Sequence, residues 1–478
     1  MDNESEAQSQ LLNPHLQKSP GENKLARTNL VRALKRRRFI CLAQILGAAC
    51  ICVALVLLAG TYLARRRKSG ALFSNSDRLD SMTSLKGPPT NSFRDNLRSD
   101  TKYVTAWGSG GWTNDVIGAM NLIYLGLITE RVALLPDFLP SRLMLTTVGT
   151  EFATLPFTEV FDLPYLRKTA NIPILEWREV KAPERMSLDD LGCWSVWQSV
   201  QYEDADPRQS YSTWDLQLDV SYTKTPEWIK MRPEIKNDRF SSFWALATLA
   251  YPSARESSIS PPLPNKHNVT LPPDDQLLCF DFLYYVAAYK PHEIELDYSP
   301  AWRFVGQHMR WTKTLSVLAE DYVRRSLGLH SYEKIPPFIT VHVRHGDFRD
   351  WCEDDVLPEN CFAPMGAIQR RVTEVRDELS QVHGIEAKSV IVTSDETNEN
   401  WWHLVEALGW RRVDHSSTIE RYGEWYPILI DAVIQSSGSG FVGTARSTVS
   451  ILARRRVESW QNGPTRMVRW GRLGSDDH

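Results

Sequence analysis

The most constraining feature of the sequence is a regular alternation of strand and helix patterns in residues 336–478. Short apolar runs rich in β-branched residues alternate with amphipathic segments, two of which are followed by a glycine. Such an order produces a parallel sheet, because a parallel connection has to cross the sheet and usually does so as a helix. We therefore expect an α/β fold with a doubly wound sheet in this part of the chain.

A second unit of this kind begins near residue 102. It has a strand at 103–107, a glycine-rich turn at 108–115, a buried helix at 116–128 and a strand at 132–135. This order is a βαβ unit, although the turn does not match the G-x-G-x-x-G dinucleotide pattern. The glycines fit either a tight turn or the close approach of a ligand.

The pattern between residues 140 and 300 is weaker. Several tryptophans recur there without a clean period, and we interpret them mainly as core residues rather than as a platform for sugars. Residues 252–273 are rich in proline and predict a surface loop. Residues 301–327 predict a single helix that ends at Gly328.

Residues 39–64 form an uncharged run of 26 residues with basic clusters on both sides. This run is long enough to cross a bilayer as a helix and too long for the apolar part of a signal peptide. Residues 24–38 hold seven Lys and Arg and residues 64–78 hold five, which favours a cytosolic amino terminus. We expect a single-pass type II membrane protein with its folded part in the lumen of the Golgi or endoplasmic reticulum.

Charge is distributed unevenly along the chain. Residues 1–68 hold 12 Lys and Arg against 4 Asp and Glu, whereas residues 69–478 hold 43 against 54. A folded part with an acidic excess is a poor general partner for nucleic acid, which requires a basic face. We expect no nucleic-acid partner.

Four cysteines follow the apolar run and allow three pairings. We favour Cys352 with Cys361, which closes a short loop, and Cys193 with Cys279, while free buried thiols are the alternative. Asn268 begins an N-glycosylation sequon in the proline-rich loop, which fits a lumenal address.

Polar residues follow three of the strands predicted in residues 336–478. Arg344 and Asp347 follow the first, Asp395 follows the second, and Ser447 and Thr448 open the helix after the third. Parallel strands end at one edge of their sheet, where ligands of such folds bind. A guanidinium fork and a hydroxyl-rich helix start both suit phosphate oxygens, and carboxylates such as Asp395 and Asp431 suit a ribose or a purine. Ordinary helix capping is the alternative for Ser447 and Thr448.

Three motifs carry a resemblance to a known family. The segment 342–348, His-Val-Arg-His-Gly-Asp-Phe, resembles the H-x-R-x-x-D-F motif of protein O-fucosyltransferases, most closely the thrombospondin-repeat type. The segment 110–114 resembles the glycine-rich motif near the amino terminus of that family, and Asp431 with 441–448 resembles its carboxyl-terminal motif. The resemblance covers roughly 102–140 and 335–460, and the motifs occur in the same order.

The resemblance implies two Rossmann-like domains that face each other across a cleft, the GT-B arrangement. It implies GDP-fucose as donor substrate, a protein or glycan hydroxyl as acceptor, inversion at the anomeric carbon, and no essential metal or other cofactor. Arg344 would stabilise the leaving diphosphate as the catalytic cation. The other residues that it implies are His342, Asp347, Asp395, Asp431, Ser447 and Thr448 for the donor, and Gly110, Gly111 and Asn114 at the cleft.

The general base is the point where this sequence departs from the family. Some members carry a glutamate in the glycine-rich motif, but Gly110 or Gly111 stands there in this chain. Asp115 is the nearest candidate, and a residue of the middle region or the leaving phosphate itself are alternatives. Two further hypotheses stay open: the same fold with another donor or a polysaccharide acceptor, and a catalytically silent lumenal binding protein.

The expected organisation follows from these features. It comprises a disordered cytosolic tail at 1–38, a transmembrane helix at 39–64, a stem at 65–101, an amino-terminal Rossmann-like domain on the acceptor side at 102–300, a bridging helix and linker at 301–335, and a carboxyl-terminal Rossmann-like domain on the donor side at 336–478.

Overall fold

The computed structural model describes residues 81–140, 154–184, 186–201, 205–236, 238–256, 260–354 and 356–477. Residues 79–478 form one compact unit. The predicted tail, the apolar run at 39–64 and the stem up to residue 80 lie outside the described residues. Within the described ranges, no helix is both long enough and apolar enough to cross a membrane.

The first sheet has six parallel strands in the order β3-β2-β1-β7-β4-β5. From β1 the chain adds β2 and β3 on one side and then continues on the other side, so the strand order reverses between β1 and β7. The strands are β1 (Tyr103–Ala106), β2 (Val132–Leu135), β3 (Ile174–Glu176), β4 (Asp189–Ser195), β5 (Leu218–Lys224) and β7 (Leu277–Phe280), and a separate pair joins β6 (Ser241–Ser242) and β8 (Val286–Ala287).

The second sheet has five parallel strands in the order β11-β10-β9-β12-β13, which confirms the parallel sheet expected from the alternation. The chain adds β10 and β11 on one side of β9 and then returns to β12 on the other, so the order reverses between β9 and β12. Ligands of such sheets bind outside the carboxyl ends of the strands at this switch point. The strands are β9 (Phe338–Val343), β10 (Ser389–Ser394), β11 (Arg411–Arg412), β12 (Gly440–Thr444) and β13 (Thr465–Val468).

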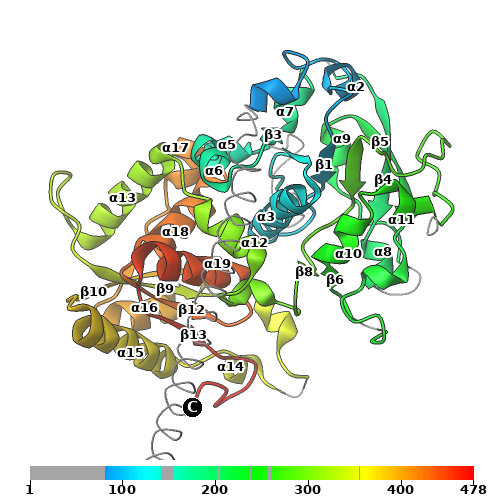
Figure 1. Cartoon of the computed structure of the whole chain (residues 1–478). Coiled ribbons are helices and arrows are strands. Elements are labelled where there is room, and N and C mark those ends of the chain that lie inside the picture. Colours follow the sequence, from blue (N-terminus) through cyan, green and yellow to red (C-terminus); the bar gives the residue numbers. More distant parts are fainter. Residues whose placement is uncertain are drawn as a thin grey trace, which may run out of the picture. The chain divides into compact units, whose positions relative to one another are not determined.

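Helices cover both faces of the second sheet. α15 (Met365–His383) lies on one face, and α18 (Tyr426–Ser437) and α19 (Thr448–Arg456) lie on the other (Figure 1). All-parallel sheets need this cover because both of their faces are apolar. The buried residues of β9 divide accordingly, with Ile339, Val341 and Val343 facing α15 and Phe338 in the cluster that contains α18.

The first half of the unit contains the six-stranded sheet and the second half contains the five-stranded sheet. In the first half, α3 (Trp112–Thr129) contacts β1, β2, α10 (Phe243–Thr248) and α12 (Pro300–Phe304). Most of its residues are buried, as its apolar sequence predicts. The other α-helices are α2 (Phe93–Asn96), α5 (Phe157–Val160), α6 (Leu163–Ala170), α7 (Trp177–Val180), α8 (Trp197–Val200), α9 (Tyr211–Asp215), α11 (Pro252–Glu256), α13 (Lys313–Leu327), α14 (Pro358–Cys361), α16 (Glu399–Ala407) and α17 (Thr418–Tyr422).

The shorter turns are five 3-10 segments and one π-helical turn within the described residues. They are η1 (Ser81–Ser84), η2 (Glu227–Ile229), η3 (Glu293–Glu295), η4 (Gly306–His308), η5 (Gly346–Trp351) and the π-turn η6 (Val457–Gln461), which continues α19.

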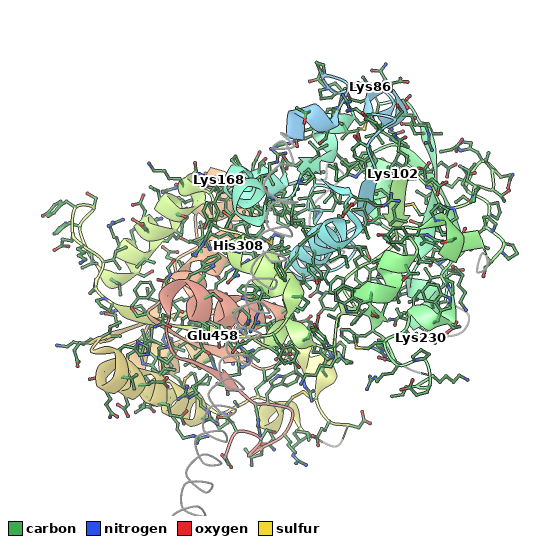
Figure 2. All side chains as sticks on the ribbon, viewed as in Figure 1. Lys86, Lys102, Lys168, Lys230, His308 and Glu458 are labelled. Carbon is green, nitrogen blue, oxygen red and sulfur yellow. A yellow bond between two sulfur atoms is a disulfide. The ribbon has the colours of Figure 1, made fainter. Side chains whose placement is uncertain are left out.

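Tryptophan side chains join the two halves of this unit. Trp311 donates its indole N–H to Ser436 Oγ at 2.8 Å, and Trp460 donates to the carbonyl of Gln307 at 2.8 Å. Figure 2 labels His308 in η4, the segment that contains Gln307, and Glu458 in η6, the segment that contains Trp460. One hydrophobic cluster therefore contains residues of both halves, including Trp302 and Leu452.

The prediction of a stem that extends to residue 101 is wrong for residues 81–101. Phe93 and Leu97 are buried, and the Phe93 ring lies edge-on to Trp177 with 5.8 Å between centroids. Asn96 donates its side-chain amide to the carbonyl of Val180 at 3.0 Å. Burying one such aromatic side chain contributes on the order of 2 kcal/mol, so this short polar-looking segment is anchored to the first sheet.

The prediction of one helix over 301–327 is also wrong. The chain forms α12, then η4, and starts again at α13, where Thr312 accepts a hydrogen bond from the backbone N–H of Leu315 as the N-cap. Val305, between the first two, has a non-helical backbone with φ −128° and is fully buried. A threonine cap interrupts a periodic pattern because its side chain competes with the helical backbone bond.

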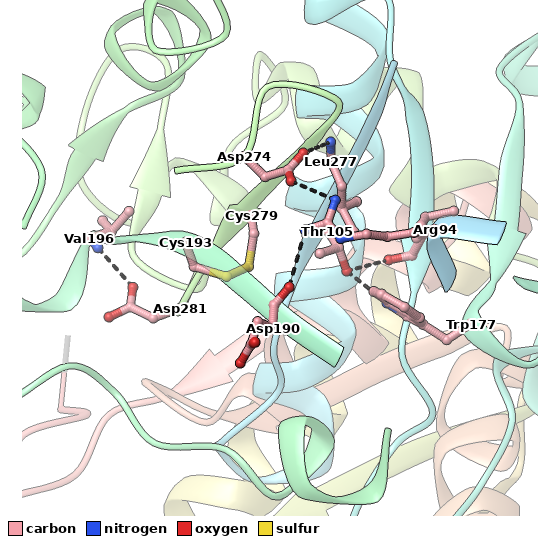
Figure 3. The surroundings of a disulfide bond; sticks show 11 residues. Arg94, Thr105, Trp177, Asp190, Cys193, Val196, Asp274, Leu277, Cys279 and Asp281 are labelled. Atoms are coloured by element: carbon pink, nitrogen blue, oxygen red, sulfur yellow. Dashed lines mark hydrogen bonds and ion pairs between the residues drawn. A yellow bond between two sulfur atoms is a disulfide. The ribbon is translucent and has the colours of Figure 1, made fainter. Parts of the chain in front are cut away.

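Both favoured cysteine pairs are disulfide-bonded. Cys193 of β4 is bonded to Cys279 of β7, its neighbour in the first sheet (Figure 3). Cys352 is bonded to Cys361 at the end of α14. Asn268 lies in an exposed part of the loop that follows α11. The sequon is therefore sterically open to modification.

Candidate functional site

The switch point of the second sheet brings together two of the strand ends named from the sequence. The backbone N–H of Arg344, which follows β9, donates to Thr444 Oγ1 at 3.0 Å. The same hydroxyl donates to the carbonyl oxygen of His342 at 3.1 Å. Thr444 is the last residue of β12, so its side chain ties the two strand ends together just before α19 begins.

His342 lies beneath this edge. Its Nδ1 is 2.7 Å from Ser450 Oγ, and that hydroxyl accepts the backbone N–H of Thr444 at 2.9 Å. Burial, together with the nearby Arg344 cation, lowers the pKa of His342 to about 3. The imidazole is therefore neutral at physiological pH, and it supports the start of α19 by hydrogen bonding rather than by charge.

The Arg344 guanidinium is held by two carboxylates. Its Nη2 lies 2.8 Å from Asp347 Oδ1 and its Nη1 lies 2.9 Å from Asp395 Oδ2. The other oxygen of Asp395 accepts the backbone N–H of His345 at 2.8 Å. A Cβ atom at Gly346 would lie 2.2 Å from the Asp395 carboxylate, so any other residue here would displace that carboxylate from Arg344. The three charged residues predicted at this edge thus form one cluster.

His345 completes the wall beside this cluster. Its ring lies 4.3 Å from the ring of Phe362, and its Nδ1 lies 2.6 Å from Glu396 Oε2. Burial alone would raise the pKa of Glu396, but hydrogen bonds from the backbone of Asn398 and from His345 hold it below its ordinary value. Glu396 is therefore a carboxylate that fixes the ring of His345. No role for Glu396 was predicted from the sequence.

The start of α19 lies next to Thr444. Ser447 is its N-cap and accepts the backbone N–H of Ser450 at 3.5 Å, a long capping bond. The Thr448 hydroxyl is 2.7 Å from the hydroxyl of Thr113, in the first turn of α3. The amino ends of two helices therefore meet here. Unpaired N–H groups and the positive ends of the helix dipoles favour an anion at such a place.

Asp431 lies in a separate cavity of the second half. The cavity measures about 680 Å³ and is lined by the carboxyl end of β10 together with Trp402, Arg412, His415 and Asp431. Asp431 Oδ1 lies 2.8 Å from His415 Nε2, and the His415 ring stacks on Tyr322. This volume and mixture of aromatic and charged groups would accommodate a nucleoside. His415 gave no sequence signal because no motif contains it.

Asp115 fixes the glycine-rich turn of the first half. Its Oδ1 accepts the backbone N–H groups of Ser109 at 3.1 Å and Gly110 at 3.0 Å, and Gly111 is the N-cap of α3. A Cβ atom at Gly110 would lie 2.9 Å from the Cβ of Asn114, so that turn packs closely on the helix. Burial raises the pKa of Asp115 to about 6 against the effect of these hydrogen bonds.

Three residues near the carboxyl end of the first sheet were not predicted from the sequence. Arg208 donates to the carbonyl of Ser109 at 2.7 Å and lies 4.4 Å above the Trp197 ring. Asp281, directly after β7, is fully buried and accepts the backbone N–H of Arg208 at 3.1 Å. Burial raises the pKa of Asp281 to about 6.

Asp137 is the third missed residue. It lines a small cavity with Asn114 and Asp115, and burial, with help from the Glu176 charge, raises its pKa to about 6. Asp137 follows the predicted strand at 132–135, so it could have been predicted in the same way as the polar residues that follow strands of the second sheet.

The described residues contain no group of three or more His, Cys, Asp and Glu side chains that could hold a metal ion. Two parallel sheets with polar switch points define this chain as an α/β protein built from two Rossmann-like halves.

Comparisons with known proteins give matches in structure. No protein-family model matches the sequence, and no curated protein matches it. The crystal structure of POFUT1 in complex with GDP-fucose is similar with a TM-score of 0.47 and 14% identity, covering 78% of this chain and 99% of that one. The fucosyltransferase NodZ from Bradyrhizobium is similar with a TM-score of 0.38 and 12% identity, covering 74% and 93%.

Proposed function

We propose that this chain is an inverting glycosyltransferase of GT-B arrangement that transfers fucose from GDP-fucose to a protein or glycan hydroxyl. The observation that carries the proposal is the link from Arg344 through Thr444 to the start of α19. This bond holds the residue that carries the guanidinium next to a helix amino terminus, at the carboxyl ends of the adjacent strands β9 and β12, where a diphosphate would contact both. The choice of fucose and guanosine follows from the motif resemblance of the sequence.

The donor side would work mainly by electrostatics. When GDP leaves, negative charge develops on the β-phosphate, and a cation already in place lowers that barrier. Asp347 and Asp395 hold the Arg344 fork at the strand end, so the guanidinium needs little reorganisation. Asp431 and its cavity would hold the nucleoside. No step in this scheme requires a metal ion.

The acceptor side would work by proton transfer. The acceptor hydroxyl gives its proton to Asp115, its oxygen attacks the anomeric carbon, and the bond from that carbon to the β-phosphate oxygen breaks on the opposite face. A base is most useful when its pKa lies near the working pH, and about 6 satisfies this for Asp115. The hydrogen bonds from Ser109 and Gly110 fix the carboxylate for this role.

The cellular location of the protein is also part of the proposal. The apolar run at 39–64 would anchor the protein in a type II orientation, with residues 79–478 in the lumen of the Golgi or endoplasmic reticulum. The two disulfides and the exposed sequon at Asn268 support an oxidising compartment. The enzyme would encounter its acceptor substrate in that compartment.

A ligand panel tests the proposal on the full chain in detergent. Thermal stability would be measured with GDP-fucose, GDP, UDP-glucose and CMP-sialic acid, followed by an assay of GDP release with candidate acceptors. Stabilisation by GDP-fucose and GDP alone is expected, because the motif resemblance points to guanosine and a ligand that binds the folded state stabilises it. Preference for another nucleotide would show a different donor, and no shift with any of them would show a silent binding protein.

A further inference from the structure

A cavity lined by described residues lies wholly in the first half. It measures about 880 Å³, which is within the range of small-molecule sites. Its inner end is formed by Gly108, Ser109, Gly110 and Asp115, at the switch point between β1 and β7. Doubly wound sheets bind ligands at this position, and no residue of the donor site lines this cavity.

The glycine-rich turn at one end of the cavity leads into the helix turn that contacts α19. Thr113 lies between Gly110 and Asp115 in sequence, in the first turn of α3, and its hydroxyl contacts Thr448 of α19 at 2.7 Å. Asp115 and Thr113 lie in the same first turn of α3, so a molecule that reaches Asp115 lies within one helical turn of the residue that contacts α19. This is where an acceptor hydroxyl has to be for the transfer proposed above.

The outer wall is aromatic and exposed. Trp214 and Tyr211, both on α9, keep 58% and 46% of their surface exposed, and Trp197 lies deeper in the lining. Two exposed aromatic side chains on one wall of a cavity give it an apolar surface that a ligand can cover. Polar groups from Gln209, Ser210 and Lys266 lie among them.

We propose that this cavity is the acceptor site and that it takes the end of a carbohydrate chain. This inference rests on the proposed transferase function and names its acceptor class. A sugar ring has C–H groups on its faces and hydroxyls around its rim, which matches aromatic faces interspersed with polar groups. A cavity of this size holds a few sugar rings, whereas a folded protein domain could only touch its opening.

The floor of the cavity is fixed before any acceptor binds. Arg208 stacks on Trp197 and bonds the carbonyl of Ser109, while Ser210 Oγ donates to the carbonyl of Gly108. Buried Asp281 accepts the backbone N–H groups of Val196 at 2.8 Å and Arg208 at 3.1 Å. Such a preorganised wall lowers the entropy that binding has to overcome. Arg208 and Asp281 are thus positioning residues.

Calorimetry on the full chain tests the inference. The probes are neutral tetrasaccharides of glucose, mannose, galactose and N-acetylglucosamine, each up to about 10 mM, and a serine-rich peptide. At least one tetrasaccharide should bind. Trp214→Ala should weaken it by about tenfold, corresponding to one lost aromatic contact, and leave GDP binding unchanged. Trp244→Ala is the matched control, because Trp244 is 50% exposed on α10 and does not line the cavity.

The outcomes separate this inference from the proposed function. If GDP-fucose binds but no tetrasaccharide does, or if only the peptide binds, the carbohydrate acceptor is wrong and the donor assignment stands. If the sugar affinity of Trp214→Ala equals that of Trp244→Ala, the cavity is not the site. If tetrasaccharides bind in a Trp214-dependent way but no nucleotide binds, the site is real and the transferase is wrong. Tyr211→Ala provides a second variant on the same wall.

Discussion

The hydroxyl groups of Thr113 and Thr448 lie 2.7 Å apart, although 335 positions separate them in the sequence. One belongs to the first turn of α3 after the glycine-rich turn, and the other begins α19 after β12. The switch points of the two sheets are thereby brought next to each other. A donor held at one and an acceptor held at the other could react without a large movement of either half.

The first prediction concerns this contact. Thr113→Val and Thr448→Val keep the side-chain shape and remove the hydrogen bond, so each should lower the free energy of unfolding by about 1 kcal/mol. The double variant should lose less than the sum, because both changes remove one interaction. Urea denaturation of the four proteins measures this coupling. Strictly additive losses would show that the two hydroxyls do not interact in solution.

The second prediction concerns Arg344. Arg344→Ala should reduce transfer by about a hundredfold or more, because the charge on the leaving diphosphate loses its cation, while the thermal midpoint changes little. Arg344→Lys should recover only part of the rate, since an ammonium lacks the planar fork. Arg411→Ala is a suitable control, because Arg411 is an exposed arginine in edge strand β11 of the same sheet and lies outside the proposed donor site. Normal turnover by Arg344→Ala would remove the proposed role.

Several elements could be predicted from the sequence because their signals are local. The continuous apolar run at 338–343 predicts a strand. The helix that follows ends at Gly384, which has the left-handed backbone of a helix end with φ +65°. Edge strand β5 alternates apolar and polar residues from Leu218 to Lys224, a signal that was present and overlooked. Helix α13 was found, but its start was misplaced because the cap at Thr312 was not recognised.

The candidate site was predictable only where it follows predicted strands. Arg344 and Asp347 were found in this way, and the structure brings them together with Asp395. Arg208 lies on a connection between elements of the weakly patterned middle region, so nothing local marked it. Asp281 follows β7, a strand of four residues that a single short apolar run cannot distinguish from a helix turn. Long-range pairing, not local propensity, gives both residues their positions.

The third prediction concerns the charge balance around the guanidinium. Asp395→Asn keeps an oxygen that can accept from the backbone of His345 and removes a negative charge 2.9 Å from Arg344. GDP should bind more tightly, by roughly two- to fivefold, because a partly exposed ion pair of up to about 1 kcal/mol no longer competes with the phosphate. Titration calorimetry at low and high salt measures this, and the gain should shrink with salt. Weaker binding would mean that Asp395 itself accepts a hydrogen bond from the nucleotide.

The fourth prediction is a pH dependence that assigns the base. Burial raises the pKa of Asp115 to about 6, so the carboxyl becomes neutral as the pH falls through that value. A base has to be charged to accept a proton, and kcat/KM should therefore fall about tenfold per pH unit below 6. A carboxyl with a raised folded pKa destabilises the fold as it ionises, between its ordinary pKa and about 6. Neutralising Asp115 therefore adds stability at low pH, and unfolding through this group cannot explain the loss of activity.

Two variants decide whether Asp115 is that base. Asp115→Asn should lower kcat by about a hundredfold or more and abolish the acidic limb, which is the fall in kcat/KM below pH 6. The amide oxygen of the new side chain can still accept the backbone N–H groups of Ser109 and Gly110. Asp137→Asn is the matched control, because Asp137 lines the same small cavity and burial raises its pKa to about 6 as well. A limb that survives in Asp115→Asn and disappears in Asp137→Asn would transfer the role to Asp137. A limb that survives in both would leave the departing phosphate as the proton acceptor.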